Sequence, residues 1–212
     1  MIETASPVQD WLDGTFGQAL LQRIAGLTGK RVLVAVAGAP GSGKSTLAAE
    51  LVKRLPGAAL VPMDGFHLDD LLLAERGLLA RKGAVETFDA DGFAALVARL
   101  AQPDREVIYP IFDRSREIAI AGSGVVSADQ RIVVIEGNYL LLDLHPWNEI
   151  HYDLTICLDV PETELQRRLT ERWQGFGKKP EAIRAHLEND LANAHRVIVQ
   201  SMEADIVIEA TI

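Results

Sequence analysis

The sequence predicts an α/β fold in which helices cover both sides of a mainly parallel sheet. Short apolar runs rich in Val, Ile and Leu alternate with longer segments of helical periodicity, a pattern typical of such a sheet. The length of 212 residues fits one domain with a small insertion, and 48% hydrophobic residues suffice for a sizeable core. We therefore expect a single domain over residues 1–212.

The first part of the chain alternates helix and strand around a glycine-rich turn. Residues 31–37, RVLVAVA, form an apolar run rich in Val after the initial arginine, as expected of a strand buried on both faces. The turn after them leads into a helix at 44–55, and residues 58–63 form a second short strand. Before them, residues 8–27 predict a helix, because apolar side chains recur at helical spacing at Leu12, Phe16, Leu20, Ile24 and Leu27.

Between about residues 66 and 126 this alternation breaks down. We expect two helices and two short strands there, separated by a polar segment at 81–89 and followed by a glycine turn at 122–124. The expected helices span 69–79 and 91–100, and the expected strands span 105–112 and 117–120. This part is therefore predicted to be an inserted lobe that binds the substrate.

The last part returns to the strand–helix alternation. Residues 131–136 and 153–160 are apolar enough to be buried strands. Pro161 fits the first position of a helix, where its missing N–H does no harm. A long helix is expected at 181–202 and a final strand at 205–209.

Composition excludes several classes of protein. The formal net charge of -9 argues against a nucleic-acid partner, which would need a basic face. No apolar run approaches the ~20 residues that span a bilayer, so we expect no membrane segment. The N-terminus has no basic cluster and does not resemble a signal peptide, which predicts a cytoplasmic protein. The oligomeric state stays open, with a homodimer among the expected forms.

One motif predicts a nucleoside triphosphate site. Residues 38–45 match GxxxxGK[ST], directly between the first strand and its helix. Backbone N–H groups and the helix N-terminus would hold the phosphates, Lys44 would reach the β- and γ-phosphates, and Ser45 would bind Mg²⁺. We assign nucleotide binding to Gly38, Ala39, Pro40, Gly41, Ser42, Gly43, Lys44, Ser45 and Thr46.

Two carboxylates come at the ends of predicted parallel strands, where ligands of open α/β sheets bind. Glu136 ends the strand at 131–136 and is a candidate second ligand of Mg²⁺, although it also fits a plain strand-end charge. Asp64 follows the second strand and is a candidate catalytic base, although Asp64-Gly65 also fits an ordinary turn.

A pair of arginines lies further along the chain. Arg168 and Arg172 are four residues apart and share one face of a predicted helix. They are candidates for stabilising the transferring phosphoryl group, with Arg168 catalytic, or else solvated charges paired with nearby glutamates.

Other P-loop classes fit the sequence less well. The chain has neither the NKxD motif of GTPases nor an LSGGQ-like signature of ABC-type ATPases. AAA-type ATPases normally carry an Asp-Glu pair after the second nucleotide strand, whereas Glu136-Gly137 stands here.

Taken together, several motifs resemble the phosphoribulokinase, uridine kinase and bacterial pantothenate kinase family of P-loop kinases. They are GAPGSGKST, MDGFH, ERGLLARKGAVETFD, YPIFDR, VVIEGNYLL, LDVPETELQRRLTER and ADIVI, in this order along nearly the whole chain. The compact length and the NYLLLD segment are most similar to a subgroup described as fructose transport system kinases. The resemblance implies a P-loop NTPase-type three-layer sandwich with a small acceptor lobe.

The resemblance also implies roles for individual residues. Asp64 would be the base near the acceptor hydroxyl, Arg168 the lid arginine on the transferring phosphate, and Asp205 would lie where the chain passes the adenine. The motifs place acceptor-binding residues at His67, Arg81, Lys82, Tyr109, Asp113, Asn138, Tyr139 and Asn193, although His67 also fits a plain loop residue.

The function predicted from the sequence is transfer of the γ-phosphoryl group of ATP, with Mg²⁺, to a metabolite hydroxyl. A sugar is the first expected acceptor, followed by pantothenate and then a nucleoside. Two alternatives remain, namely a regulatory ATPase without a small acceptor and a P-loop protein that only binds partners.

Overall fold

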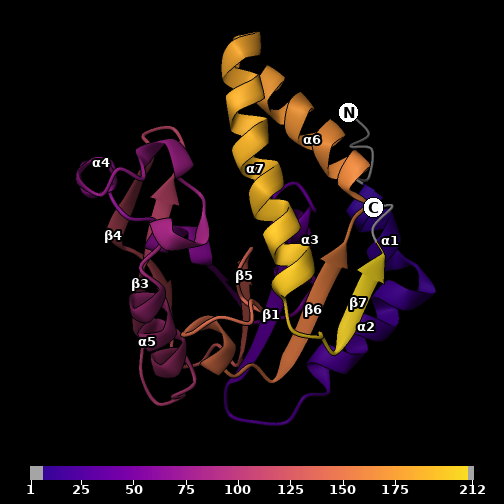
Figure 1. Ribbon diagram of the computed structural model, residues 1–212. Helices are drawn as coiled ribbons and strands as arrows, with labels where there is room; N and C mark the ends of the chain where they lie inside the picture. The colour runs from indigo at the N-terminus through magenta and orange to yellow at the C-terminus, as the bar shows by residue number, and fades with distance from the viewer. Residues whose placement is uncertain (1–6, 210–212) are drawn as a thin grey trace, which may run out of the picture.

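The computed structural model describes residues 7–209 and has a five-stranded parallel sheet at its centre (Figure 1). The strand order is β2-β5-β1-β6-β7, and every neighbouring pair is parallel. The strands are β1 (Val32–Gly38), β2 (Ala59–Pro62), β5 (Ile132–Gly137), β6 (Leu154–Asp159) and β7 (Ile206–Glu209). The predicted α/β class with a mainly parallel sheet is confirmed.

Alternate residues of β1 face two separate hydrophobic cores. Leu33 and Ala35 pack with α5 (Ala90–Leu100) and with Val197 of α7 (Pro180–Gln200). Val34 packs on the other side of the sheet, against the helices α1 (Pro7–Asp13), α2 (Thr15–Ala25) and α3 (Lys44–Arg54). Every residue of β1 is buried, which explains its unbroken apolar run.

The segment between β2 and β5 carries a sheet of its own. β3 (Val107–Asp113) and β4 (Ile118–Val126) pair antiparallel, beside the short helix α4 (Asp70–Glu75). The lobe lies on one side of the parallel sheet in Figure 1, across from α7. Four 3-10 helices complete the described chain: η1 (Met63–Phe66), η2 (Leu79–Arg81), η3 (Val85–Thr87) and η4 (Trp147–Glu149).

Two helices project beyond the carboxyl ends of the strands. α6 (Glu162–Gly175) and α7 pack against each other as a pair, and Figure 1 shows them standing above the arrowheads of β6 and β7. No helix within residues 7–209 is long and apolar enough to cross a membrane.

Several expected boundaries were wrong. The helix predicted at 8–27 breaks at Gly14, whose extended backbone separates α1 from α2, and Phe16 is 82% exposed rather than on the apolar face. The helix predicted at 69–79 ends at Glu75. Pro161 caps α6 instead of occupying its first turn.

The glycine turn predicted at 122–124 was also wrong, because these residues continue β4. Gly124 lies opposite Tyr109 in the β3–β4 ladder, and a Cβ there would lie 2.3 Å from the Tyr109 ring. This glycine therefore gives space to an aromatic neighbour and does not turn the chain.

Candidate active site

The P-loop connects the end of β1 to the first turn of α3. Gly43 precedes α3 with φ of 95°, a left-handed conformation that a residue with a Cβ would adopt only under strain. Because α3 begins at Lys44, its first N–H groups face the end of the sheet where phosphates would bind. The local geometry therefore matches the motif's predicted role.

A hydroxyl and a carboxylate meet beside the loop. The Ser45 Oγ donates a hydrogen bond to Oε2 of Glu136 over 3.0 Å. Glu136 is only 5% exposed, and burial raises the pKa of its carboxyl above the usual range while the positive charge of Lys44 opposes the shift. Hydroxyl and carboxylate oxygens are ligands that Mg²⁺ prefers, so Ser45 and Glu136 are the residues that would hold a magnesium ion here.

Asp64 lies in η1, directly after β2. β2 pairs with β5 so that Pro62 stands opposite Glu136, which brings Asp64 to the same edge of the sheet as Glu136. Its carboxylate forms an ion pair with Arg114 of the β3–β4 turn at 2.5 Å. The base predicted from sequence is therefore held by a cation of the inserted lobe.

Lys44, Asp64 and Arg114 border one cavity of about 510 Å³, which we call the P-loop cavity. Its volume is in the range of small-molecule sites. Eight residues predicted from the sequence line it: Pro40, Lys44, Asp64, His67, Lys82, Asn138, Arg172 and Asn193.

His67 is held between two aromatic rings. Its ring centroid lies 4.1 Å from that of Phe88 and 4.6 Å from that of Phe112, and its Nδ1 lies 2.8 Å from the Asp64 carbonyl oxygen. Burial lowers the pKa of the imidazole, although the charge of Asp64 opposes this. A neutral His67 therefore links the wall of the cavity to the backbone of Asp64.

Lys82 reaches the cavity from the segment between η2 and η3. Its ammonium group contacts Asp70 Oδ1 at 2.6 Å and the Glu117 carbonyl at 2.8 Å, and lies 5.2 Å from the centre of the Phe112 ring. These contacts fix a positive charge at the lobe side of the cavity.

The two arginines predicted to act together, Arg168 and Arg172, have different surroundings. Arg168 donates to the Ser42 carbonyl of the P-loop over 3.2 Å and to Glu164 over 2.7 Å. Hydrogen bonds from Arg167 and Arg168 lower the pKa of Glu164 to about 2. Arg172 lines the P-loop cavity one turn further along α6.

Five other predicted site residues lie elsewhere. Tyr109 donates its hydroxyl to the Leu60 carbonyl and Tyr139 to the Gly83 carbonyl, so both join the lobe to the core. Asp113 accepts hydrogen bonds from Ser115 in the β3–β4 turn, Asp205 accepts them from Thr155 between β6 and β7, and Arg81 pairs with Glu86 in another cavity.

The structure adds cavity residues that the sequence reasoning missed. Arg114, Trp173, His186, Asn189 and Asp190 all line the P-loop cavity. Trp173 donates to Asp190 over 2.8 Å, and its ring stacks on that of His186 at 4.0 Å. The spacing of Asn189 to the predicted Asn193 marks one helical face and would have indicated it. Arg114 is the last residue of the YPIFDR motif, and that motif was the signal that could have indicated it.

Comparison with known proteins gives the family. A family profile described as an AAA domain matches residues 34–193, which include the P-loop. A Schizosaccharomyces pombe protein provisionally named a uridine kinase is 36% identical over 196 residues, which cover 85% of this chain and 83% of that protein. The pantothenate kinase of Salmonella newport is 29% identical over 175 residues, covering 75% of this chain and 55% of that enzyme.

A solved structure is similar over almost the full length. The crystal structure of a protein from Silicibacter sp. TM1040, provisionally named a fructose transport system kinase, is 43% identical. The match covers 97% of this chain and 100% of the Silicibacter chain, with a TM-score of 0.85. The chain therefore belongs to a family of P-loop kinases, in which relatives similar to it are named uridine kinase and pantothenate kinase.

Proposed function

We propose that this chain transfers the γ-phosphoryl group of Mg-ATP to a hydroxyl of a sugar-like metabolite. Its family already makes it an ATP-dependent phosphotransferase with an alcohol acceptor. The proposal adds the metal, the roles of individual residues and the acceptor class. One observation carries it: Lys44 and Asp64 line the same cavity, beside the hydrogen-bonded pair of Ser45 and Glu136.

The nucleotide half supplies positive charge and the metal ligands. Lys44 would contact the β- and γ-phosphates, and Arg168 stands next to the loop at the Ser42 carbonyl, within reach of a transferring group. Mg²⁺ held by Ser45 and Glu136 would neutralise phosphate charge. In-line transfer then depends mainly on positioning and electrostatics.

The acceptor half supplies the base and hydrogen-bonding groups. Asp64 would accept the proton of the attacking hydroxyl once the acceptor separates it from Arg114. Asn138 lines the same cavity, and its Oδ1 is buried without a hydrogen-bond partner in the described structure. A buried acceptor atom left unpaired is costly, and a ligand hydroxyl would satisfy it.

Several polar side chains around the cavity favour a polyhydroxylated acceptor. His67, Asn189 and Asn193 line the cavity with side chains that can donate and accept hydrogen bonds. The 43% identical protein from Silicibacter sp. TM1040 carries fructose in its provisional name, which supports the same class.

A coupled assay of ADP release tests the proposal. Fructose, other hexoses, pantothenate and uridine are each added to enzyme and Mg-ATP, and a sugar is expected to accelerate ADP release most. Turnover with pantothenate or uridine alone would overturn the acceptor class and leave the kinase assignment standing. ATP hydrolysis that no acceptor accelerates would overturn the kinase assignment in favour of a regulatory ATPase.

A further inference from the structure

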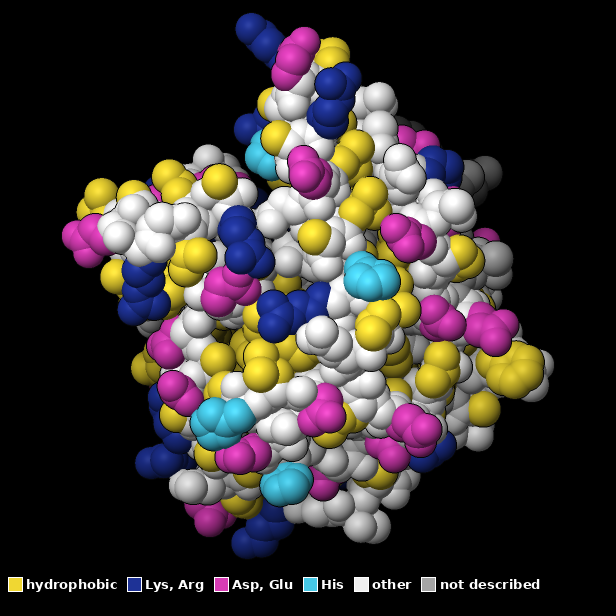
Figure 2. All heavy atoms as spheres, in the orientation of Figure 1, with side chains coloured by type: hydrophobic (Ala, Val, Ile, Leu, Met, Phe, Trp, Pro, Cys, Tyr) yellow, Lys and Arg dark blue, Asp and Glu magenta, His cyan; other side chains and the backbone are white. Residues whose placement is uncertain are grey.

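A second cavity lies behind the wall of the P-loop cavity. It has a volume of about 520 Å³ and opens to solvent, and we call it the Arg196 cavity. Figure 2 shows basic and acidic side chains side by side at a hollow next to the lower half of α7, with hydrophobic side chains below them. No residue of the proposed catalytic machinery lines this cavity.

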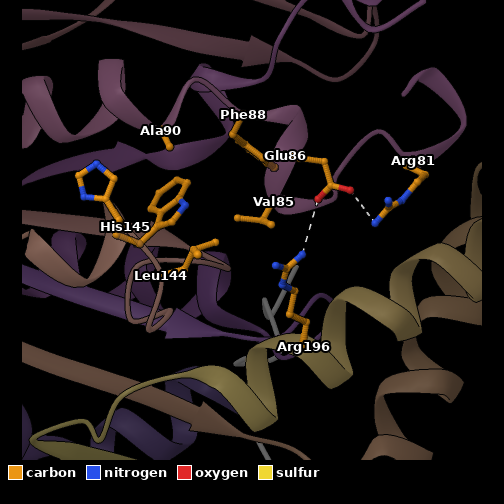
Figure 3. A pocket seen from close by; sticks show the side chains of 9 residues that line it. Arg81, Val85, Glu86, Phe88, Ala90, Leu144, His145 and Arg196 are labelled. Atoms are coloured by element: carbon orange, nitrogen blue, oxygen red, sulfur yellow. Dashed lines mark ion pairs between the residues drawn. The ribbon is translucent and has the colours of Figure 1, made fainter. Parts of the chain in front are cut away.

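The cavity has an apolar end and a charged end (Figure 3). Val85, Phe88 and Trp147 are at most 6% exposed and form a hydrophobic surface, extended by the 40% exposed Leu144. At the other end, Glu86 lies between the guanidinium groups of Arg81 and Arg196.

The charges at this end are incompletely paired. Glu86 contacts Arg81 at 2.6 Å, but its contact to Arg196 is 3.7 Å, beyond hydrogen-bond length. Its Oε2 is buried and accepts no hydrogen bond in the described structure. Two guanidinium groups thus face one carboxylate, which leaves a net positive charge beside a hydrophobic surface.

We propose that the Arg196 cavity binds a small organic anion with an apolar body, and that its occupancy changes the affinity of the P-loop cavity for the acceptor. The anion would pair with Arg196 and the half-exposed Arg81, while the body would cover Val85 and Leu144. An oxyanion suits guanidinium groups geometrically, and an apolar body gains from leaving water.

One segment forms a wall shared by the two cavities. Arg81 and Glu86 line the Arg196 cavity, Lys82 and Gly83 line the P-loop cavity, and Phe88 lines both. Helix α7 also belongs to both cavities, because Asn189 and Asn193 line the P-loop cavity and Arg196 lines the Arg196 cavity.

Hydrogen bonds tie this wall to the acceptor side. Asn189 donates to the Lys82 carbonyl over 2.9 Å, and Tyr139 donates to the Gly83 carbonyl over 2.6 Å. Moving Arg81 or Arg196 toward a ligand would therefore shift the segment that carries Lys82 and, through Phe88, the ring that packs on His67. This regulatory part rests on the proposed function, whereas the binding site itself does not.

Binding is tested with the fluorescent anion 1-anilinonaphthalene-8-sulfonate, added to protein saturated with Mg-ADP. Phenylacetate is expected to displace it, and the matched neutral compound phenylacetamide is not. Leu144→Glu places a negative charge in the cavity and Arg196→Gln removes a positive one, so each should weaken binding about tenfold or more, on the scale of a hydrogen bond to a charged group. The control Leu71→Glu, at a 79% exposed site on α4, should bind as the wild type does.

Equal affinity of the wild type and Leu144→Glu, or equal displacement by the acid and the amide, would overturn the site. Coupling is read by amide hydrogen exchange in residues 81–89, which the bound anion should slow, and by the KM for the acceptor, which should change about fivefold or more. Slowed exchange with an unchanged KM for the acceptor would overturn the proposed coupling, while the proposed anion-binding site would stand. If no acceptor is turned over at all, the proposed function fails, while displacement and exchange still decide the site.

Discussion

The carboxylate of Asp64 is oriented by Arg114, a residue from a different part of the chain. Asp64 comes from the end of β2 and Arg114 from the β3–β4 turn, and they meet at 2.5 Å. A base that is positioned in advance loses little entropy when the acceptor arrives. Under the proposed function, the inserted lobe would therefore contribute to catalysis as well as to acceptor binding.

Asp64→Asn tests this assignment. The amide keeps the shape of the side chain but cannot accept a proton, so turnover should fall about 10²-fold or more, while Mg-ATP affinity stays near the wild-type value. The measurements are acceptor-dependent ADP release and calorimetric titration with nucleotide. Asp113→Asn is the matched control, since that carboxylate does not line the P-loop cavity, and equal losses in both variants would contradict the assignment.

The buried His67 should make the stability of the protein depend on pH. Burial lowers the pKa of His67 in the folded protein below the 6.5 of an unfolded chain, so the unfolded state binds the proton more readily. The free energy of unfolding should therefore fall as the pH drops below about 6.5, by up to about 1.4 kcal/mol per pH unit for one proton.

Denaturant unfolding between pH 5 and 7.5 measures this slope. His67→Gln should have a flatter dependence than the wild type over this range. A His67→Gln slope equal to that of the wild type would show that the imidazole protonates as easily in the folded state.

At the scale of elements, the sequence predicted the strands of the parallel sheet better than the inserted lobe. β1, β5 and β6 are buried on both faces or nearly so, and their unbroken apolar runs reveal them. The strands of the lobe are half exposed, so their pattern is weak: β4 extends through the glycines at 122 and 124, whose role depends on a cross-strand partner.

Close packing between η1 and β3 holds Asp64 in place. A Cβ on Gly65 would lie 2.1 Å from the carbonyl oxygen of Pro110. Gly65→Ala should therefore destabilise the protein by about 1 to 3 kcal/mol, as overpacking does, and displace the neighbouring Asp64. Unfolding and ADP release measure the two effects. Gly175→Ala at the end of α6 has no atom within 4 Å of its Cβ and should retain both stability and activity.

In the candidate site too, the residues on the parallel sheet were easier to predict from the sequence than those of the inserted lobe. Strand order places Lys44, Asp64 and Glu136 at one edge, because the carboxyl ends of parallel strands meet there, and the sequence predicted these three together. Side-chain direction in the lobe follows no such rule. Arg81 and Lys82 are adjacent yet line different cavities. The hydroxyls of Tyr109 and Tyr139 donate hydrogen bonds to backbone carbonyl groups.

Nucleotide binding should stabilise the entire molecule, because β1, the P-loop and α3 connect both hydrophobic cores. A ligand at one hundred times its Kd adds about 2.7 kcal/mol to the free energy of unfolding, which corresponds to a rise in Tm of about 5 to 11 °C for a chain of this size. Lys44→Ala removes the predicted phosphate contact, so its rise with the same Mg-ATP concentration should be less than half as large. Lys53→Ala, in the same helix but 65% exposed at its side chain, should show the full rise. A full rise in Lys44→Ala would mean that the nucleotide binds away from the P-loop.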